Sequence, residues 1–189
     1  TYGVSAFQIN FASHEIMTPG DAPDVLVAMN PAALAVNLGA LKAGGTLVVN
    51  TGAFKAIDLK KAKLDSNPLE DGTLDGYRVI SVDINARVLD ALVDSTLSTK
   101  DKSRCKNFYT LGLMYWLYSR PLEPTEKWLH KKFAKRPELA EANVTAMRAG
   151  FAAGDIHEMF QGRFEVPAAA LQPGTYRNIM GNQALALGL

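Results

Sequence analysis

Short polar side chains follow two apolar stretches of this sequence, at the point where each stretch ends. Asn30 follows the first, and Asn50, Thr51 and Gly52 lie at the end of the second. Residues of this size let a phosphate or carboxylate approach backbone N–H groups, and the nearby Lys55 could add positive charge. The sequence therefore predicts an anion-binding site at these five residues, provided that the two stretches end side by side.

Each of these residues also has a purely structural explanation. Asn30 precedes Pro31, and this pair is typical of an N-cap residue followed by the first residue of a helix. Asn50, Thr51 and Gly52 could simply form a tight turn. The residues alone leave both readings open.

Other chemical motifs are missing from the sequence. The three histidines, His14, His130 and His157, lack the spacing of a metal site, and Cys105 is the one cysteine. The sequence contains no Gly-rich dinucleotide motif, no phosphate-binding loop ending in Lys-Ser/Thr and no serine nucleophile elbow. We expect no catalytic residue and no metal ligand in this chain, and we expect Cys105 to be buried on a helix.

The composition is that of a soluble globular protein. The 189 residues are 48% hydrophobic and 21% charged, and the net charge is +1. A balance this even gives no overall attraction to nucleic acid or to a membrane surface. No apolar run approaches the roughly 20 residues of a membrane span. We expect a cytoplasmic protein in a reducing compartment, with no nucleic acid or membrane as partner.

One segment departs from this even balance. Residues 100–136 contain ten Lys or Arg residues against three acidic residues. Such a segment could face an acidic partner or a polyphosphate ligand, or it could be a solvated helical face.

The elements that position the polar residues follow from hydrophobic patterning. Residues 24–29 and 46–50 are continuous apolar runs, typical of strands buried on both faces, and 32–42 between them has helical spacing. A strand, a helix and a strand with short joints predict a parallel βαβ unit. Residues 77–82 predict a third strand, and the carboxyl ends of parallel strands are where open sheets bind ligands.

The remaining elements are mostly helical. We expect a helix at 86–93 and helices from 103 to 160 with breaks near Pro121 and Pro137, while the alternating residues 4–11 predict a strand. The sequence thus predicts an α/β fold with a mostly parallel sheet flanked by helices and a helical C-terminal part.

Several strings, in this order, closely resemble one family. They include GVSAFQINFA, TPGDAPDVLVAMNPAAL, GGTLVVNT, NPLEDGTLDGY, SRCKNFYTLGLMYWLYSRP and PGTYRNIMGNQALALGL. The family is the alpha subunit of the 2-oxoacid:ferredoxin oxidoreductases, and the resemblance is to the 2-oxoglutarate type. It implies a Rossmann-like gamma-type domain at 1–160 without its usual N-terminal strand, a linker at 161–174, and at 175–189 the start of the pyrimidine-type domain of thiamine enzymes. We therefore expect a piece of a longer polypeptide.

The resemblance also implies the chemistry. The family converts 2-oxoglutarate, coenzyme A and oxidised ferredoxin to succinyl-CoA, carbon dioxide and reduced ferredoxin. A partner beta subunit holds thiamine diphosphate, Mg²⁺ and a [4Fe-4S] cluster, and an (αβ)2 assembly is implied. In related pyruvate enzymes the gamma-type domain helps to cover coenzyme A, and the segments that do so match GVSAFQ, the strand end at Asn30 and the turn of Asn50, Thr51 and Gly52. Lys55, the nearest lysine after the second strand, could add charge for the phosphates of coenzyme A. This chain alone is expected to be inactive.

Two alternatives stay open at this point. The same domain could serve an enzyme that acts on pyruvate or another 2-oxoacid. It could also be a non-catalytic binding or assembly module, because no acid, base or nucleophile constellation is visible in the sequence.

Overall fold

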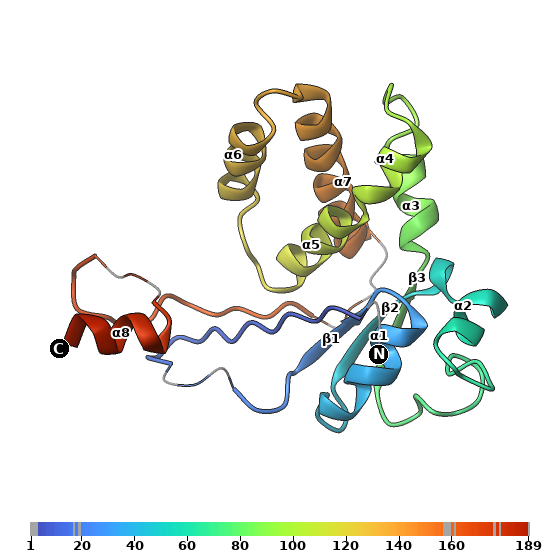
Figure 1. The fold of residues 1–189 in the computed structure, drawn as a ribbon, viewed down its shortest axis with the longest axis horizontal. Helices are drawn as coiled ribbons and strands as arrows, with labels where there is room; N and C mark the ends of the chain where they lie inside the picture. The colour runs from blue at the N-terminus through green and yellow to red at the C-terminus, as the bar shows by residue number, and fades with distance from the viewer. Residues whose placement is uncertain are drawn as a thin grey trace.

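A three-stranded parallel sheet lies at the centre of the computed structural model, which describes residues 4–16, 18, 20–156, 160, 162–175, 177 and 179–188 (Figure 1). Its strands are β1 (Val25–Ala28), β2 (Thr46–Asn50) and β3 (Arg78–Val82), in the order β1-β2-β3. Val27 pairs with Val48, and Val48 with Ile80. The predicted parallel strands are thus confirmed, and their carboxyl ends share one edge.

Helices lie on both faces of the sheet, as predicted, but β3 is largely exposed, with Val79 38% exposed. One face packs against α1 (Pro31–Asn37), the 3-10 turn η1 (Leu38–Ala40) and the loop around Leu74. The other face packs against Tyr109 of α5 and Ala146 of α7. β2 is buried on both faces because it is the middle strand, which explains its unbroken apolar run.

The helical part follows β3 along the chain. Its elements are α3 (Ile84–Ala91), α4 (Thr99–Arg104), α5 (Lys106–Leu117), α6 (Glu123–Lys132) and α7 (Pro137–Ile156). The breaks between the last three helices fall near Pro121 and Pro137, where the sequence placed them. Cys105 lies between α4 and α5 and is 1% exposed, so its predicted burial is confirmed.

Helices α5 and α7 cross with their backbones in contact. A Cβ atom added to Gly112 would lie 1.9 Å from the carbonyl oxygen of Met147, and one added to Gly150 would lie 1.9 Å from that of Tyr109. No side chain fits into either space, so these two glycines set how closely the helices approach.

The strand expected at 4–11 is absent. Phe7 is 88% exposed and Ile9 65% exposed, and no described strand pairs with this segment. An alternating pattern favours a strand only where a neighbouring strand offers its backbone and a core takes the apolar side chains. The segment is instead fixed at Phe11, whose ring contacts that of Tyr118 at a centroid distance of 5.0 Å.

The C-terminal residues leave the helical part beside this N-terminal segment. The Phe164 ring stacks on Tyr118 at 5.1 Å, and the Phe164 N–H donates to the Leu117 carbonyl oxygen. The chain then runs to α8 (Gly181–Gly188), which lies apart from the other helices in Figure 1. The predicted boundaries at 160, 161–174 and 175–189 stay predictions. No described helix is both long and apolar enough to cross a membrane.

Candidate functional site

The candidate site is the carboxyl edge of the sheet, where β1, β2 and β3 end next to one another. At the end of β1, the Oδ1 atom of Asn30 accepts a hydrogen bond of 2.8 Å from the backbone N–H of Ala33. Asn30 is half-buried, and Pro31 opens α1 directly after it. Asn30 is therefore the N-cap of α1, and its oxygen is used within the fold.

Asn50 is fully buried at the end of β2. Its Oδ1 atom accepts from the backbone N–H of Ile84 at 3.0 Å, and its Nδ2 donates to the Met29 carbonyl oxygen at 3.3 Å and to Oδ1 of Asn85 at 3.2 Å. These three bonds join the chain that follows β1, the end of β2 and the start of α3. The sequence predicts either a ligand contact or a turn residue at Asn50. In the structure, the hydrogen bonds of its side chain hold the three strand ends together.

Gly52 lies against the end of β3. A Cβ atom at this position would come within 2.1 Å of the Oδ1 atom of Asp83. That same oxygen accepts a bond of 2.9 Å from the Ala86 N–H and so caps α3. Glycine is needed here because the cap of α3 occupies the space of a side chain.

Thr51 and Lys55 differ from Asn30, Asn50 and Gly52 because the fold does not use their side chains. Thr51 opens the 3-10 turn η2 (Thr51–Ala53) half-buried, and Lys55 precedes α2 (Ala56–Lys61) with an exposed side chain. Neither side chain is bonded or ion-paired within the described residues. Of the five predicted site residues, these two keep their polar groups available.

Two residues at this edge were missed by the sequence reasoning. Asp83 and Asn85 follow β3 just as Asn30 and Asn50 end the other two strands, and this shared position was the signal that could have found them. Asn50 donates to Oδ1 of Asn85, so the Nδ2 group of Asn85 is turned away from that bond and remains a hydrogen-bond donor at the edge.

Helix α5 approaches the same edge from the other face of the sheet. Its Thr110 hydroxyl lies 3.5 Å from the sulfur of Met29. Close to it, burial raises the pKa of the Cys105 thiol to about 11, with a smaller contribution from the Asp101 charge. The thiol therefore stays protonated at neutral pH and is a poor nucleophile. What the edge offers is binding by hydrogen-bond donors and one cation.

None of the five predicted site residues lines the cavity beside Leu74 or the cavity at the opposite end of the sheet. A cavity of about 460 Å³ lies at the other end of β2 and β3, lined by Thr46, Arg78 and Phe164 among others. Among the described residues, no group of His, Cys, Asp and Glu side chains could hold a metal ion, and His157 lies outside them. A large ligand at the edge would need further protein to enclose it.

Comparisons with known proteins support one interpretation of this fold. A family model described as pyruvate ferredoxin/flavodoxin oxidoreductase matches residues 1–153. The 2-oxoglutarate oxidoreductase subunit KorA of Mycobacterium tuberculosis is 48% identical over 187 residues, which are 99% of this chain and 29% of that subunit. The chain therefore spans under a third of the length of this relative.

A solved structure shares the fold. It is the 2-oxoglutarate:ferredoxin oxidoreductase from Magnetococcus marinus with 2-oxoglutarate, coenzyme A and succinyl-CoA bound. The match covers 83% of this chain and 24% of that one, with a TM-score of 0.57 and 21% identity. At this identity the likeness concerns the fold alone.

Proposed function

Because the chain belongs to the pyruvate ferredoxin/flavodoxin oxidoreductase family, we propose that it is part of the alpha subunit of a 2-oxoglutarate:ferredoxin oxidoreductase. The enzyme decarboxylates 2-oxoglutarate, transfers the succinyl group to the thiol of coenzyme A and passes the electron pair to ferredoxin. The observation that carries the proposal is the 48% identity to a 2-oxoglutarate oxidoreductase subunit along 99% of this chain. We place the enzyme in the cytoplasm.

The role proposed for this region is to bind coenzyme A at the carboxyl edge of the sheet. Lys55 supplies charge for the phosphates of coenzyme A, and the hydroxyl of Thr51 and the Nδ2 group of Asn85 donate hydrogen bonds. Asn30, Asn50 and Gly52 act indirectly, since their contacts hold the three strand ends in register. Because none of these residues lines either cavity, the site suits a ligand that is shared with the rest of the enzyme.

The cofactors of the reaction belong to a partner in this proposal. The residues of this chain do not fit a [4Fe-4S] cluster, which needs four thiolates, because its one cysteine is buried and protonated. We assign thiamine diphosphate, Mg²⁺ and the cluster to a beta subunit, and an (αβ)2 assembly to the enzyme. Thiamine diphosphate supplies the carbanion that attacks the 2-oxoacid, so no step of the decarboxylation falls to residues described here.

The test is to produce the intact alpha subunit that carries this chain together with its beta subunit. The purified complex should reduce ferredoxin only when both 2-oxoglutarate and coenzyme A are present, and the 189-residue chain alone should be inactive. Faster turnover of pyruvate or of a branched-chain 2-oxoacid would move the assignment to another enzyme of the family. A complex without thiamine diphosphate and without turnover of any 2-oxoacid would identify a non-catalytic module and overturn the proposal.

A further inference from the structure

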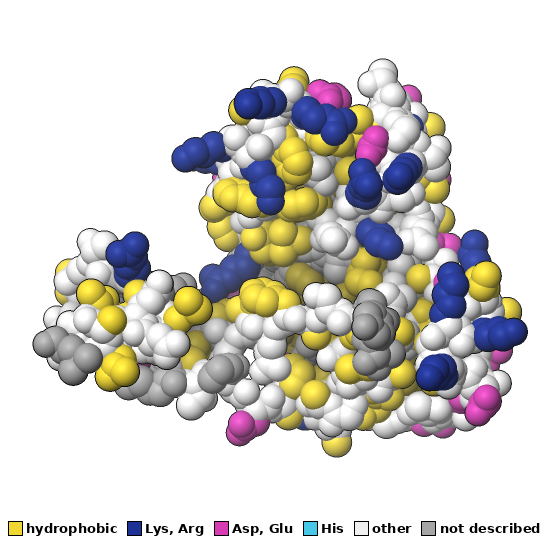
Figure 2. All heavy atoms as spheres, viewed as in Figure 1, with side chains coloured by type: hydrophobic (Ala, Val, Ile, Leu, Met, Phe, Trp, Pro, Cys, Tyr) yellow, Lys and Arg dark blue, Asp and Glu magenta, His cyan; other side chains and the backbone are white. Residues whose placement is uncertain are grey.

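Helices α4 and α6 carry a concentration of positive charge that coenzyme A binding does not use. Figure 2 shows Lys and Arg side chains gathered over the helical part of the molecule, with few acidic side chains among them. We call this surface the basic face, and its members are Lys100, Lys102, Arg104, Lys127, Lys131, Lys132, Lys135 and Arg136.

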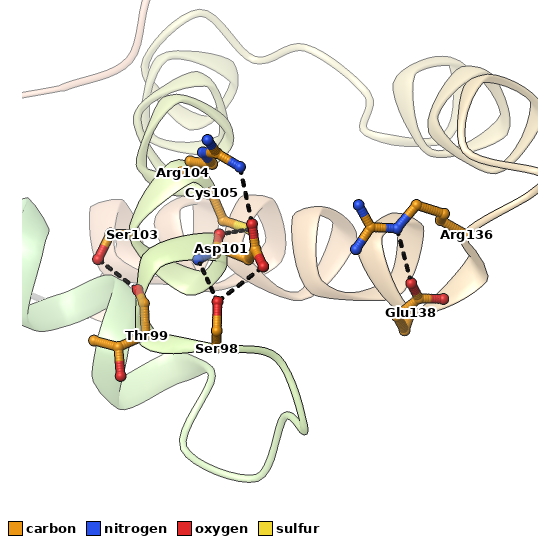
Figure 3. A network of polar contacts seen from close by, with 8 residues as sticks. All are labelled: Ser98, Thr99, Asp101, Ser103, Arg104, Cys105, Arg136 and Glu138. Carbon is orange, nitrogen blue, oxygen red and sulfur yellow. Dashed lines mark hydrogen bonds and ion pairs between the residues drawn. The ribbon is translucent and has the colours of Figure 1, made fainter.

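The arginines of the basic face are paired with acids, and the lysines are not. Arg104 lies 3.0 Å from a carboxylate oxygen of Asp101, and Arg136 lies 3.1 Å from one of Glu138 (Figure 3). The Ser98 hydroxyl lowers the pKa of Asp101, and Arg104 and Arg136 lower it further, so α4 and the loop after α6 lie close together. Asp101 and Glu138 are thus already paired with arginines of this surface.

The lysines of α6 point to solvent. Lys127, Lys131 and Lys132 are exposed, and none of them forms an ion pair with any described residue. Glu126, the nearest acid on the same helix, is bound by Arg148 of α7 at 2.7 Å. Glu123 is the other acid of α6 and forms no ion pair with any described residue, so the three lysines leave a net positive charge on the outer face of α6.

A large aromatic side chain lies within this charge. Trp128 is 47% exposed, and its ring centroid lies 6.5 Å from that of Phe108. The Nζ atom of Lys132 lies 4.3 Å from the centre of the Trp128 ring. A half-exposed Trp that lies beside Phe108, with Lys132 over its ring, has the composition of a protein–protein hot spot.

The contacts of Trp128, Leu129 and Phe133 argue against a nucleic acid and against a membrane as the partner of the basic face. Single-stranded nucleic acid stacks its bases on free aromatic faces, and Lys132 already covers a face of Trp128. A helix that lies in a membrane surface needs a broad exposed apolar stripe, whereas Leu129 and Phe133 of this region pack into the core beside Val144.

We infer that the basic face is a docking site for an acidic surface of a partner protein, with Trp128 at its centre. Carboxylates of the partner pair with the free lysines of α6, and an apolar group of the partner packs on the edge of the Trp128 ring. Steering by the lysines speeds the encounter, and contact with Trp128 slows dissociation. This inference does not depend on the identity of the 2-oxoacid or on coenzyme A binding.

The test uses the full 189-residue chain and a labelled polyglutamate peptide as the acidic probe, at low salt. Two triple variants change the net charge equally, K127E/K131E/K135E on the basic face and K60E/K61E/K63E on and after α2. Replacement on the basic face should weaken binding about tenfold or more, whereas the control triple should change it less than about twofold. Binding should also change the fluorescence of Trp128, a change that is absent in Trp128→Phe. Thermal unfolding confirms that each variant is folded.

Three results would overturn the inference. Equal weakening by both triple variants would show attraction by net charge alone. Tighter binding of a single-stranded oligothymidylate than of the peptide would identify a nucleic-acid surface. Tighter binding to phosphatidylserine vesicles than to the peptide would identify a membrane surface.

Discussion

The crossing of α5 and α7 and the carboxyl edge of the sheet are both closely packed, but chiefly through different contacts. At the crossing, backbone meets backbone at Gly112 and Gly150, and the Trp116 Nε1–H of α5 donates a hydrogen bond of 3.2 Å to Asp155 of α7. At the edge, the buried amide of Asn50 makes three hydrogen bonds. In sequence, polar residues at strand ends therefore look like binding residues. In the structure, their donors and acceptors form hydrogen bonds within the protein. The polar groups of the half-buried Thr51 and the exposed Lys55 stay available beside them, which is why ligand binding is proposed for these two.

The largest effect is expected at the crossing. Gly150→Ala places a methyl group 1.9 Å from the Tyr109 carbonyl oxygen, which neither helix can accommodate without moving apart. We expect a loss of about 3 kcal/mol in the free energy of unfolding, measured by urea denaturation. Gly39→Ala is the matched control, because a Cβ atom there meets nothing within 4 Å. Equal stability of the two variants would show that the crossing is loose.

The next effect is expected at the edge. Asn50→Ala leaves the Ile84 N–H and the Met29 carbonyl oxygen buried without their partner, which should cost about 2 kcal/mol of unfolding free energy. Asn37→Ala removes one hydrogen bond, which the Asn37 side chain donates to the Ala33 carbonyl oxygen on a half-buried helix. It should cost less than half as much unfolding free energy. If Asn50→Ala unfolds at the same urea concentration as the Asn37 variant, the amide of Asn50 does not hold the strand ends.

A smaller effect on stability is expected when the Cys105 thiol, just before α5, titrates as the pH is raised. The pKa of the thiol is raised to about 11 in the folded protein, so the folded state holds its proton more tightly than the unfolded state does. The stability that this preference provides is complete below the unfolded pKa near 9 and is lost as pH rises toward 11. By about pH 10.5 the loss is just under about 2 kcal/mol, since one pKa unit corresponds to about 1.4 kcal/mol.

The measurement compares the wild type with Cys105→Ala, which cannot titrate at this position. Their difference in unfolding free energy should shrink between about pH 8 and about pH 10.5. A difference that stays constant across this range would mean that the thiol is open to solvent in the folded chain.

The sequence predicts the sheet well and the edge only in part. Runs such as 46–50 predict buried parallel strands because burial on both faces demands an unbroken apolar sequence. The alternation at 4–11 predicted a strand wrongly, because a pattern does not reveal whether a partner strand exists. The hydrogen bonds of Asn50 could not be predicted either, since its partners Ile84 and Asn85 are distant in sequence and are brought to it only by the fold.

Lys55 provides the most direct test of the central claim, which is that the exposed residues of the edge bind coenzyme A. In the assembled enzyme, Lys55→Gln should raise the Michaelis constant for coenzyme A several-fold, since one contact contributes about 1 kcal/mol. The Michaelis constant for 2-oxoglutarate and the stability should stay unchanged, and Lys63→Gln should leave all three values as they are. A Michaelis constant for coenzyme A that does not respond to Lys55→Gln would contradict the account.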